Sequence, residues 1–149
     1  MKNTIKAIIN EVLIRMEELD IPNTKEARDL IFETGNAETS YRHLEQMGGG
    51  PAISFWQLES NTIKDIWENY ITYRKPYIQM AYELGLREGE MDFCVMSNVA
   101  LAVFFCRVYY RRQPGAIPST PEERADYWKE YYNTEGGKGT VKHYLEANV

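Results

Sequence analysis

Two residues able to take part in chemistry, Glu38 and Thr39, stand between a helical run and a glycine-rich turn. The segment Ser54-Phe55-Trp56-Gln57 follows that turn. A lone carboxyl group works as a general acid near neutral pH when apolar neighbours desolvate it and raise its pKa. The two aromatic rings of this segment and that of Tyr132, later in the chain, would supply such an environment if they line one cleft. Glu38 is therefore a candidate general acid, and a hydroxyl beside an acid, here that of Thr39, can orient it.

A predicted helix positions Glu38. Asn23, three residues before Glu26 and just after a proline, is typical of a helix start, because a capping side chain and a reciprocal acid stand at that spacing. Apolar residues at helical spacing carry this helix to about Glu33. Glu38 is then expected at or just past the end of the helix.

The segment after this helix is predicted to be irregular. Because Gly48-Gly49-Gly50-Pro51 cannot hold a regular helix, residues 42–51 are expected to form a loop. The loop lacks the Gly-Lys-Ser/Thr ending of a phosphate-binding loop, which disfavours a nucleotide site. Residues 52–58 form a short, mainly apolar run that we expect to be extended.

Helices account for most of the remaining chain. Residues 1–20 carry an apolar stripe at helical spacing, which predicts an amphipathic N-terminal helix. Residues 91–110 are apolar on nearly all sides, which predicts a buried central helix. Other helices are predicted after Ser60-Asn61, over residues 76–84, from Thr120-Pro121 onward and over about 139–145. The sequence thus predicts a single mainly α domain over residues 1–149, a helical bundle around a buried central helix with one short irregular or β-like segment.

The composition limits the classes of partner. The chain has 149 residues, 44% of them hydrophobic and 26% charged, which is typical of one globular domain. Its net charge of −5 gives no global positive field for phosphate backbones, so nucleic acid is not expected as a partner. We interpret Arg107, Arg111 and Arg112 as a solvated helix end.

No metal and no cofactor are predicted. His43 and His143 lack cysteine or acidic partners at ligand spacing, which disfavours zinc. Cys94 and Cys106 fall in one predicted helix, where a rise of about 1.5 Å per residue separates them by roughly 18 Å, beyond disulfide reach. Both are therefore expected to be free, buried thiols from a reducing compartment.

Three segments resemble, in order, the motifs of soluble lytic transglycosylases, a lysozyme-like family. The family's Glu-Ser pair after a helix is similar to Ala37-Glu38-Thr39, and its Gly-Leu-Met-Gln segment before a helix start is similar to Ile53 to Thr62. Its Ala-Tyr-Asn-Ala-Gly stretch is similar to Tyr131-Tyr132-Asn133-Thr134-Glu135-Gly136-Gly137. The resemblance covers roughly residues 25 to 145 and is to small phage-encoded relatives in particular. It implies a lysozyme-like α+β form of the predicted fold.

The resemblance implies cleavage of the MurNAc–GlcNAc linkage of peptidoglycan. Glu38 would protonate the glycosidic oxygen and then, as a carboxylate, take the proton of the muramyl 6-hydroxyl, so that water is not consumed. The substrate-binding residues that the resemblance implies are Thr39, Gln57, Trp56, Tyr132 and Asn133.

The chain departs from the family pattern at several positions. Ser54 replaces the usual Gly, and Trp56 takes the place of Met, so that a bulkier ring would narrow the cleft. Thr134-Glu135 replaces a small Ala-Gly pair and adds a negative charge near the site. These departures keep a second class open, a lysozyme-like virion structural or adaptor protein that has lost turnover.

Two other carboxylates bear on the mechanism. Glu33 lies five residues before Glu38, so on a continuing helix it would point about 140° away and would not share the cleft. Glu59 is a candidate second carboxylate, which hydrolysing glycosidases hold roughly 5 to 9.5 Å from the first. Glu59 keeps a hydrolytic muramidase open.

The N-terminal stretch lacks the uninterrupted apolar run and small-residue cleavage site of a secretory signal, and no run of about 18 apolar residues marks a membrane span. A phage-encoded enzyme made in the host cytoplasm would then be delivered by a virion or released to the cell wall at lysis. Its expected partners are peptidoglycan glycan strands and other virion proteins.

Overall fold

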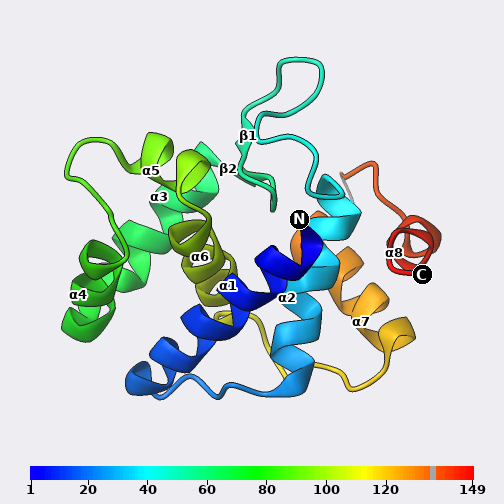
Figure 1. Ribbon diagram of the computed structural model, residues 1–149, viewed down its shortest axis with the longest axis horizontal. Coiled ribbons are helices and arrows are strands. Elements are labelled where there is room, and N and C mark those ends of the chain that lie inside the picture. The colour runs from blue at the N-terminus through cyan, green and yellow to red at the C-terminus, as the bar shows by residue number, and fades with distance from the viewer. Residues whose placement is uncertain (135–136) are drawn as a thin grey trace.

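The computed structural model describes residues 1–134 and 137–149 (Figure 1). Its α-helices are α1 (Lys2–Met16), α2 (Lys25–Glu38), α3 (Ser60–Asn69), α4 (Lys75–Glu83), α5 (Met91–Ser97), α6 (Val99–Arg111), α7 (Pro121–Trp128) and α8 (Val141–Ala147). Two short strands, β1 (Ala52–Ile53) and β2 (Leu58–Glu59), form an antiparallel sheet. Single helical turns complete the elements: the 3₁₀ turns η1 (Glu17–Leu19) and η2 (Ile71–Tyr73) and the π-helical turn η3 (Lys129–Asn133). The predicted mainly α fold with one short β segment is confirmed.

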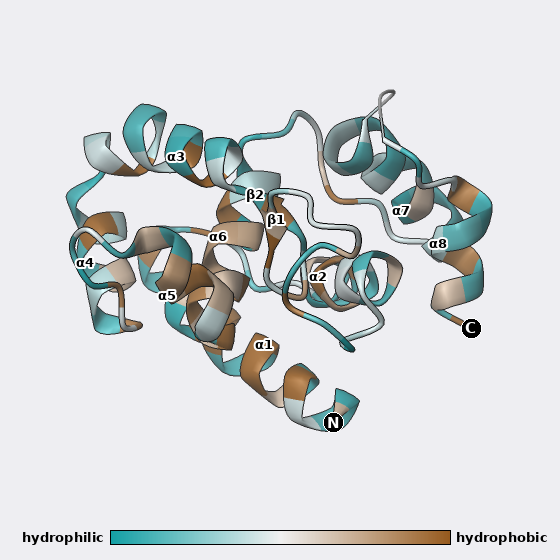
Figure 2. Cartoon of the chain, turned by 90° about the horizontal axis from the view of Figure 1, so that it is seen from above, coloured by the Kyte–Doolittle hydropathy of each residue, from teal (hydrophilic) through white to brown (hydrophobic). Residues whose placement is uncertain are grey.

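Helix α6 is the buried centre of this fold. All its residues from Leu101 to Val108 are buried, and the helix contacts α1, α2, α3 and α5. Figure 1 shows α1 crossing α2, with α3 to α5 on one side of the molecule and α7 and α8 on the other. In Figure 2 hydrophobic residues gather on α1 and α6, whereas α3 and α7 are largely hydrophilic. A helix that is apolar on all sides must be enclosed by others, and the predicted central helix is confirmed in α6.

The predicted single helix over residues 91–110 is wrong, because the chain bends by 106° between α5 and α6. The break lies at Asn98, whose side-chain oxygen accepts a hydrogen bond from the backbone N–H of Leu101 at 3.1 Å. Its side-chain nitrogen donates to the carbonyl of Leu84 at 2.7 Å. Asparagine favours this capping role over a helix interior, so it ends one helix and begins the next.

The structure places the two cysteines and Arg107 differently from the prediction. Cys94 and Cys106 lie on different helices, α5 and α6, and both are free and buried. Arg107 is only 4% exposed, so its interpretation as part of a solvated helix end is wrong. Burial lowers the pKa of its guanidinium, and the charge of Arg111 lowers it further. Cys106 and Val108, its neighbours on α6, are fully buried as well.

Helix α2, which carries the candidate acid, differs from the prediction at both ends. Thr24 caps the helix, with its side-chain oxygen accepting from the N–H of Ala27 at 3.1 Å. Asn23, the predicted cap, instead accepts from the Arg28 guanidinium at 2.8 Å. The helix continues beyond the predicted end and finishes at Glu38. Glu38 therefore has a fixed direction at a helix terminus.

The extended run predicted over residues 52–58 is a hairpin. Strand β1 pairs with β2 in the register Ala52 to Glu59 and Ile53 to Leu58, so residues 54–57 form the turn. The loop at 42–51 has the predicted irregular form and adds one bridge, between Glu45 and Ile53. This hairpin stands next to the end of α2 (Figure 1).

Across the described ranges, no single helix is long and apolar enough to cross a membrane. The bent pair of α5 and α6 meets the length and composition criteria only when both helices are taken together.

Candidate active site

Glu38 lies where two adjoining hollows of the surface meet. The first hollow, of about 370 Å³, is lined on its own side by Gln57, Leu58, Thr62, Tyr109 and Tyr132, among others. The second hollow, of about 620 Å³, is lined on its own side by Ala37, Trp128, Lys138, Gly139 and His143. Five residues line both hollows: Glu38, Gln46, Glu59, Asn133 and Gly137. The two hollows are therefore one cleft with Glu38 in its middle.

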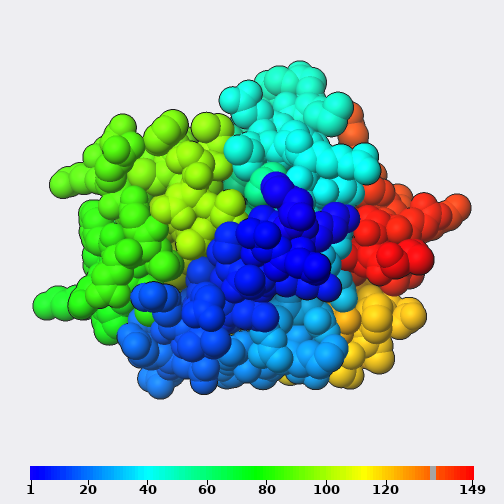
Figure 3. All heavy atoms as spheres, viewed as in Figure 1, coloured from blue at the N-terminus to red at the C-terminus, as the bar shows by residue number. Residues whose placement is uncertain are grey.

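The walls of this cleft come from segments far apart in the sequence. The loop 42–51 projects from the surface, and the segment just before α8 lies beside it (Figure 3, cyan and orange-red). Helix α2 supplies Glu38, the hairpin supplies Gln57 and Glu59, and η3 supplies Tyr132 and Asn133. The three segments predicted from the sequence to form a site are thus brought together around Glu38.

Burial sets the protonation of Glu38. The low polarity of its surroundings raises the pKa of the carboxyl from an ordinary 4.5 to about 7. One hydrogen bond acts in the opposite direction, since the indole Nε1–H of Trp128 donates to Oε2 at 3.0 Å and stabilises the carboxylate. Desolvation exceeds the hydrogen bond, so a large share of Glu38 carries its proton at neutral pH.

Three buried groups near Glu38 are uncharged at neutral pH. Burial raises the pKa of the Cys106 thiol and of the Tyr110 and Tyr132 hydroxyls, and the nearby Glu38 charge raises all three further. Neutral groups of this kind stabilise a carboxylate less than a cation does, which keeps the pKa of Glu38 high.

Trp128 is a site residue that the sequence analysis missed. It is 1% exposed and packs with Ala37, Ala125 and Tyr144 in a small core cluster beside the cleft. The ring centres of Trp128 and Tyr144 are 5.2 Å apart. The sequence spacing could have identified it, because Trp128 precedes the predicted site residue Tyr132 by four residues and so shares a helix face with it.

The turn at residues 54–57 contains two predicted site residues, Gln57 and Trp56, and only Gln57 lines the cleft. Ser54 and Gln57 both adopt left-handed backbone conformations, with φ of 70° and 52°. Gln57 lines the first hollow, as predicted, and its Nε2 donates to the Ser54 carbonyl at 2.8 Å. Trp56 is 0% exposed, and its indole donates to the Ile31 carbonyl at 2.8 Å. Trp56 is a core residue, so the expectation that it binds substrate or narrows the cleft is wrong.

Thr39 also has a different role from the predicted one. It is 5% exposed and lines neither hollow. Its hydroxyl donates to the Phe55 carbonyl at 2.8 Å and accepts from the N–H of Tyr41 at 3.1 Å. Thr39 therefore ties the end of α2 to the hairpin turn, and it holds Glu38 in place through the backbone rather than by contact with the carboxyl group or a substrate.

Tyr132 and Asn133 lie in the cleft wall, as predicted. The Tyr132 hydroxyl donates to the Trp56 carbonyl, and its ring stacks on that of Tyr110 with centres 5.2 Å apart. Asn133 lines both hollows. Both belong to the π-helical turn η3, a form of turn frequent at functional sites. Of the resembling segment Tyr131 to Gly137, Glu135 and Gly136 lie outside the described residues.

The two competing carboxylates are separated by the fold. Glu33 lines a different hollow and is bound by Arg124 through two hydrogen bonds of 2.8 Å and by the Tyr144 hydroxyl at 2.7 Å. The prediction that it does not share the cleft of Glu38 is confirmed. Glu59 is exposed and lines both hollows beside Glu38. Glu59 is thus the second carboxylate of the cleft.

The described residues contain no group of three or more His, Cys, Asp or Glu side chains arranged to hold a metal ion. His143 lines the second hollow, and its Nε2 is hydrogen-bonded to the Ala37 carbonyl at 2.7 Å. The cleft therefore offers carboxyl, hydroxyl and amide groups, together with the His143 imidazole and the Lys138 ammonium.

Comparison with known proteins gives no relative. No family model, no curated protein and no solved structure matches the chain.

The pKa of Glu38 predicts a pH-dependent cost to stability. Between its unfolded value of 4.5 and its folded value of about 7, the folded state binds a proton that the unfolded state has lost. The free energy of unfolding therefore falls as the pH rises through this window, by up to about 3 kcal/mol. Glu38→Gln cannot ionise, so we expect it to be more stable than wild type at pH 8, by up to about that amount, and similar at pH 4.

Urea denaturation at pH 4 and pH 8 measures this difference. Glu59→Gln is the matched control, because it removes an exposed carboxylate of the same cleft and should leave the pH dependence unchanged. Equal stability of wild type and Glu38→Gln at both pH values would show that Glu38 titrates as an ordinary surface acid.

Gly139 is expected to be required for the position of Trp128. A Cβ atom there would lie 2.5 Å from the Trp128 ring and 2.8 Å from Asn133 Nδ2. Because the buried ring has no room to move, Gly139→Ala should lower the free energy of unfolding by about 1–3 kcal/mol, the usual cost of overpacking. Urea denaturation at pH 6 measures the change, with Lys138→Ala as the neighbouring control. An unaltered free energy of unfolding would mean that the Trp128 ring can move to admit the added methyl group, and that Gly139 is not required for its position.

Proposed function

We propose that this chain is a peptidoglycan-cleaving lytic transglycosylase that acts on the MurNAc–GlcNAc linkage. The observation that carries the proposal is the position of Glu38, a carboxyl group with a pKa near 7 in the middle of a cleft that continues on both sides of it. An ordinary glutamate is ionised at neutral pH and has no proton to give a leaving group. A polymer cut within its length needs room on both sides of the acid.

Among the described residues, only one oxygen of the carboxyl group accepts a side-chain hydrogen bond, which leaves the other for this chemistry. Trp128 donates its N–H to Oε2, and an oxygen that accepts a hydrogen bond is better suited to carry the negative charge. The proton then belongs on Oε1. In the proposed reaction Oε1–H protonates the glycosidic oxygen as its bond to C1 of the muramyl sugar breaks.

The same carboxyl group completes the cycle. As a carboxylate it takes the proton of the muramyl 6-hydroxyl while that oxygen bonds to C1, which gives a 1,6-anhydro sugar and restores the acid. No water is consumed, and one carboxyl group is sufficient. The burial that raises the pKa of Glu38 favours both steps. It keeps a proton on the group for the first step, and it makes the ionised group a good base for the second.

Polar groups of the first hollow suit recognition of a sugar. The Nε2 of Gln57 donates to the Ser54 carbonyl, so its Oε1 remains as an acceptor for a sugar hydroxyl or an acetamido N–H. The rings of Tyr109 and Tyr132 line the same hollow and offer apolar surface for contact with a sugar ring. A neutral glycan needs such surfaces and no metal or cofactor.

Hydrolysis is the second candidate, and the position of Glu59 favours it. Glu59 lines both hollows together with Glu38, and a second carboxylate could activate a water or take the role of a nucleophile. The products separate the two mechanisms, because hydrolysis leaves a reducing end and transglycosylation leaves an anhydro ring. In either case the proposed protein is phage-encoded and reaches the wall from a virion or at lysis.

Digestion of purified peptidoglycan tests the proposal. Wild type should release anhydro-muramyl fragments that mass spectrometry identifies, and Glu38→Gln should lower the rate by at least about 10³-fold, since it removes the only proposed acid and base. The value of kcat/KM should fall as the pH rises through about 7, because only the protonated acid starts the reaction.

The variant Glu59→Gln is the control for mechanism, and it should retain most of the activity. Hydrated ends that disappear in Glu59→Gln would show a muramidase instead. A folded wild type that releases no fragments from several cell-wall types would contradict the enzyme proposal and favour a virion structural or adaptor protein.

A further inference from the structure

We propose that Lys129 is a positioning residue, which fixes the Asn133 amide so that its NH₂ group donates to an acceptor oxygen of an N-acetylated sugar in the cleft. The inference rests on the proposed function, because it deepens the description of the same site. It adds a residue that neither the motif pattern nor the cleft lining contains.

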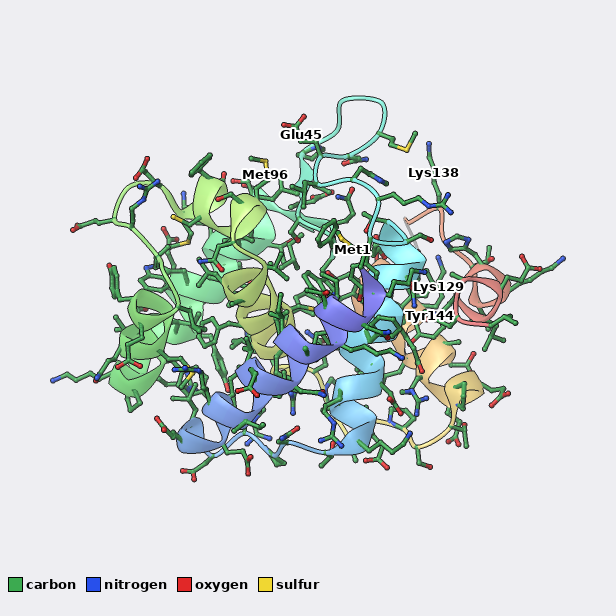
Figure 4. All side chains as sticks on the ribbon, in the orientation of Figure 1. Met1, Glu45, Met96, Lys129, Lys138 and Tyr144 are labelled. Carbon is green, nitrogen blue, oxygen red and sulfur yellow. The ribbon has the colours of Figure 1, made fainter. Side chains whose placement is uncertain are left out.

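The Lys129 ammonium is held by three oxygens. Its Nζ donates to Asn133 Oδ1 at 2.8 Å, to the Thr134 carbonyl at 2.9 Å and to the Gly137 carbonyl at 3.1 Å. An ammonium group has three N–H donors, so these partners use all of them. Figure 4 labels Lys129 between α2 and α8, close to the cleft wall that η3 forms.

This contact decides which end of the Asn133 amide is available. An ammonium donates and never accepts, so only the carbonyl oxygen of the amide is compatible with the position next to Nζ. The amide nitrogen is consequently directed elsewhere, to within 2.8 Å of where a Cβ on Gly139 would lie. Gly139 lines the second hollow and Asn133 lines both, so the amide NH₂ is presented at the cleft.

The same ammonium holds a strained turn. Thr134 has a φ of 63°, a left-handed conformation that favours glycine, and its N–H donates to the Lys129 carbonyl at 2.8 Å. The two carbonyls that Lys129 binds lie on either side of residues 135–136. Lys129 thereby holds the carbonyl of a threonine in a conformation that favours glycine, next to Asn133 in the cleft wall.

The variants separate positioning from a general structural role. Lys129→Met keeps the length of the side chain and removes all three donors. Asn133→Asp keeps the acceptor for Lys129 and replaces the NH₂ group by an oxygen. Lys142→Met is the matched control, because Lys142 is an exposed lysine of α8 whose ion pair is with Glu146, at 3.8 Å. Thermal melts of all three establish that each variant is folded.

The probe is tri-N-acetylchitotriose, and the readout is the ¹⁵N–¹H signal pair of the Asn133 side chain. In wild type the pair should shift on titration with the sugar. In Lys129→Met the affinity should fall about tenfold, the loss of one oriented hydrogen bond, and in Asn133→Asp by a similar factor, while Lys142→Met matches wild type. On peptidoglycan, Lys129→Met should raise KM about tenfold with kcat within about threefold of wild type.

The outcomes distinguish this inference from the proposed function. Sugar binding that shifts the Asn133 signals in wild type and weakens in Lys129→Met, without any cleavage, supports the role of Lys129 and contradicts the transglycosylase. Cleavage with unmoved Asn133 signals, or with unchanged affinity and KM in Lys129→Met, overturns the role of Lys129 and leaves the transglycosylase standing. A folded wild type that neither binds nor cleaves glycan overturns both.

Discussion

The site depends on one hydrogen bond made away from water, from the Trp128 indole to Glu38 Oε2. A cation in that place would stabilise the carboxylate and keep Glu38 ionised, whereas full burial without a donor would raise the pKa of the carboxyl further. A single neutral donor gives the intermediate state, with a pKa of about 7. The same interaction joins the end of α2 to the end of α7, and so the acid is also fixed in space.

The ion pair between Arg124 and Glu33 supports the hydrogen bond from Trp128 to Glu38. Arg124 binds both carboxylate oxygens of Glu33, which also accepts from the Tyr144 hydroxyl. The Tyr144 ring packs on Trp128, and the indole reaches Glu38. The two glutamates of α2 thus have opposite roles. Glu33 pairs with the cation Arg124 in a structural cluster. Glu38 accepts from the neutral Trp128 indole, pairs with no cation among the described residues and has a raised pKa.

The cleft is built differently from the core. Around α6 the chain buries regular helical surface, whereas the walls of the cleft are turns with left-handed residues, at Ser54, Gln57 and Thr134. Such conformations cost free energy for residues other than glycine and persist only where neighbouring groups hold them. Side-chain bonds to the backbone, from Gln57 and from Lys129, supply that support. Strain concentrated around one carboxyl group is typical of functional sites.

The sequence predicted the parts of this structure that are encoded locally. Helical periodicity identified α1 and the buried α6, and Thr120 caps α7 as expected, with its hydroxyl accepting from the Glu123 N–H. Glu38, a helix end beside a glycine-rich loop, was placed correctly for the same reason. The break at Asn98 was missed because the apolar pattern continues through it, and the Leu84 carbonyl that fixes the side chain lies 14 residues away.

The same distinction between local and long-range information applies to the site residues. Gln57, Tyr132 and Asn133 reach the cleft as predicted, but Trp56 does not. Two left-handed residues reverse the chain in this turn, so spacing alone cannot tell which side chains face inward. The contact of Trp128 with Glu38 spans 90 residues, and only the tertiary fold creates it. The functional conclusion stands on the site and its chemistry, because sites rather than folds carry function.

The most direct test of this account is the pKa of Glu38 itself, measured by NMR. The side-chain carboxyl ¹³C shift of Glu38, assigned by comparison with Glu38→Gln, can be followed from pH 3 to pH 9 in the folded protein. The account predicts a midpoint near 7 for Glu38. A midpoint near 4.5, the ordinary value, would mean that Glu38 is ionised at neutral pH, and the claim that this cleft holds a general acid would be wrong.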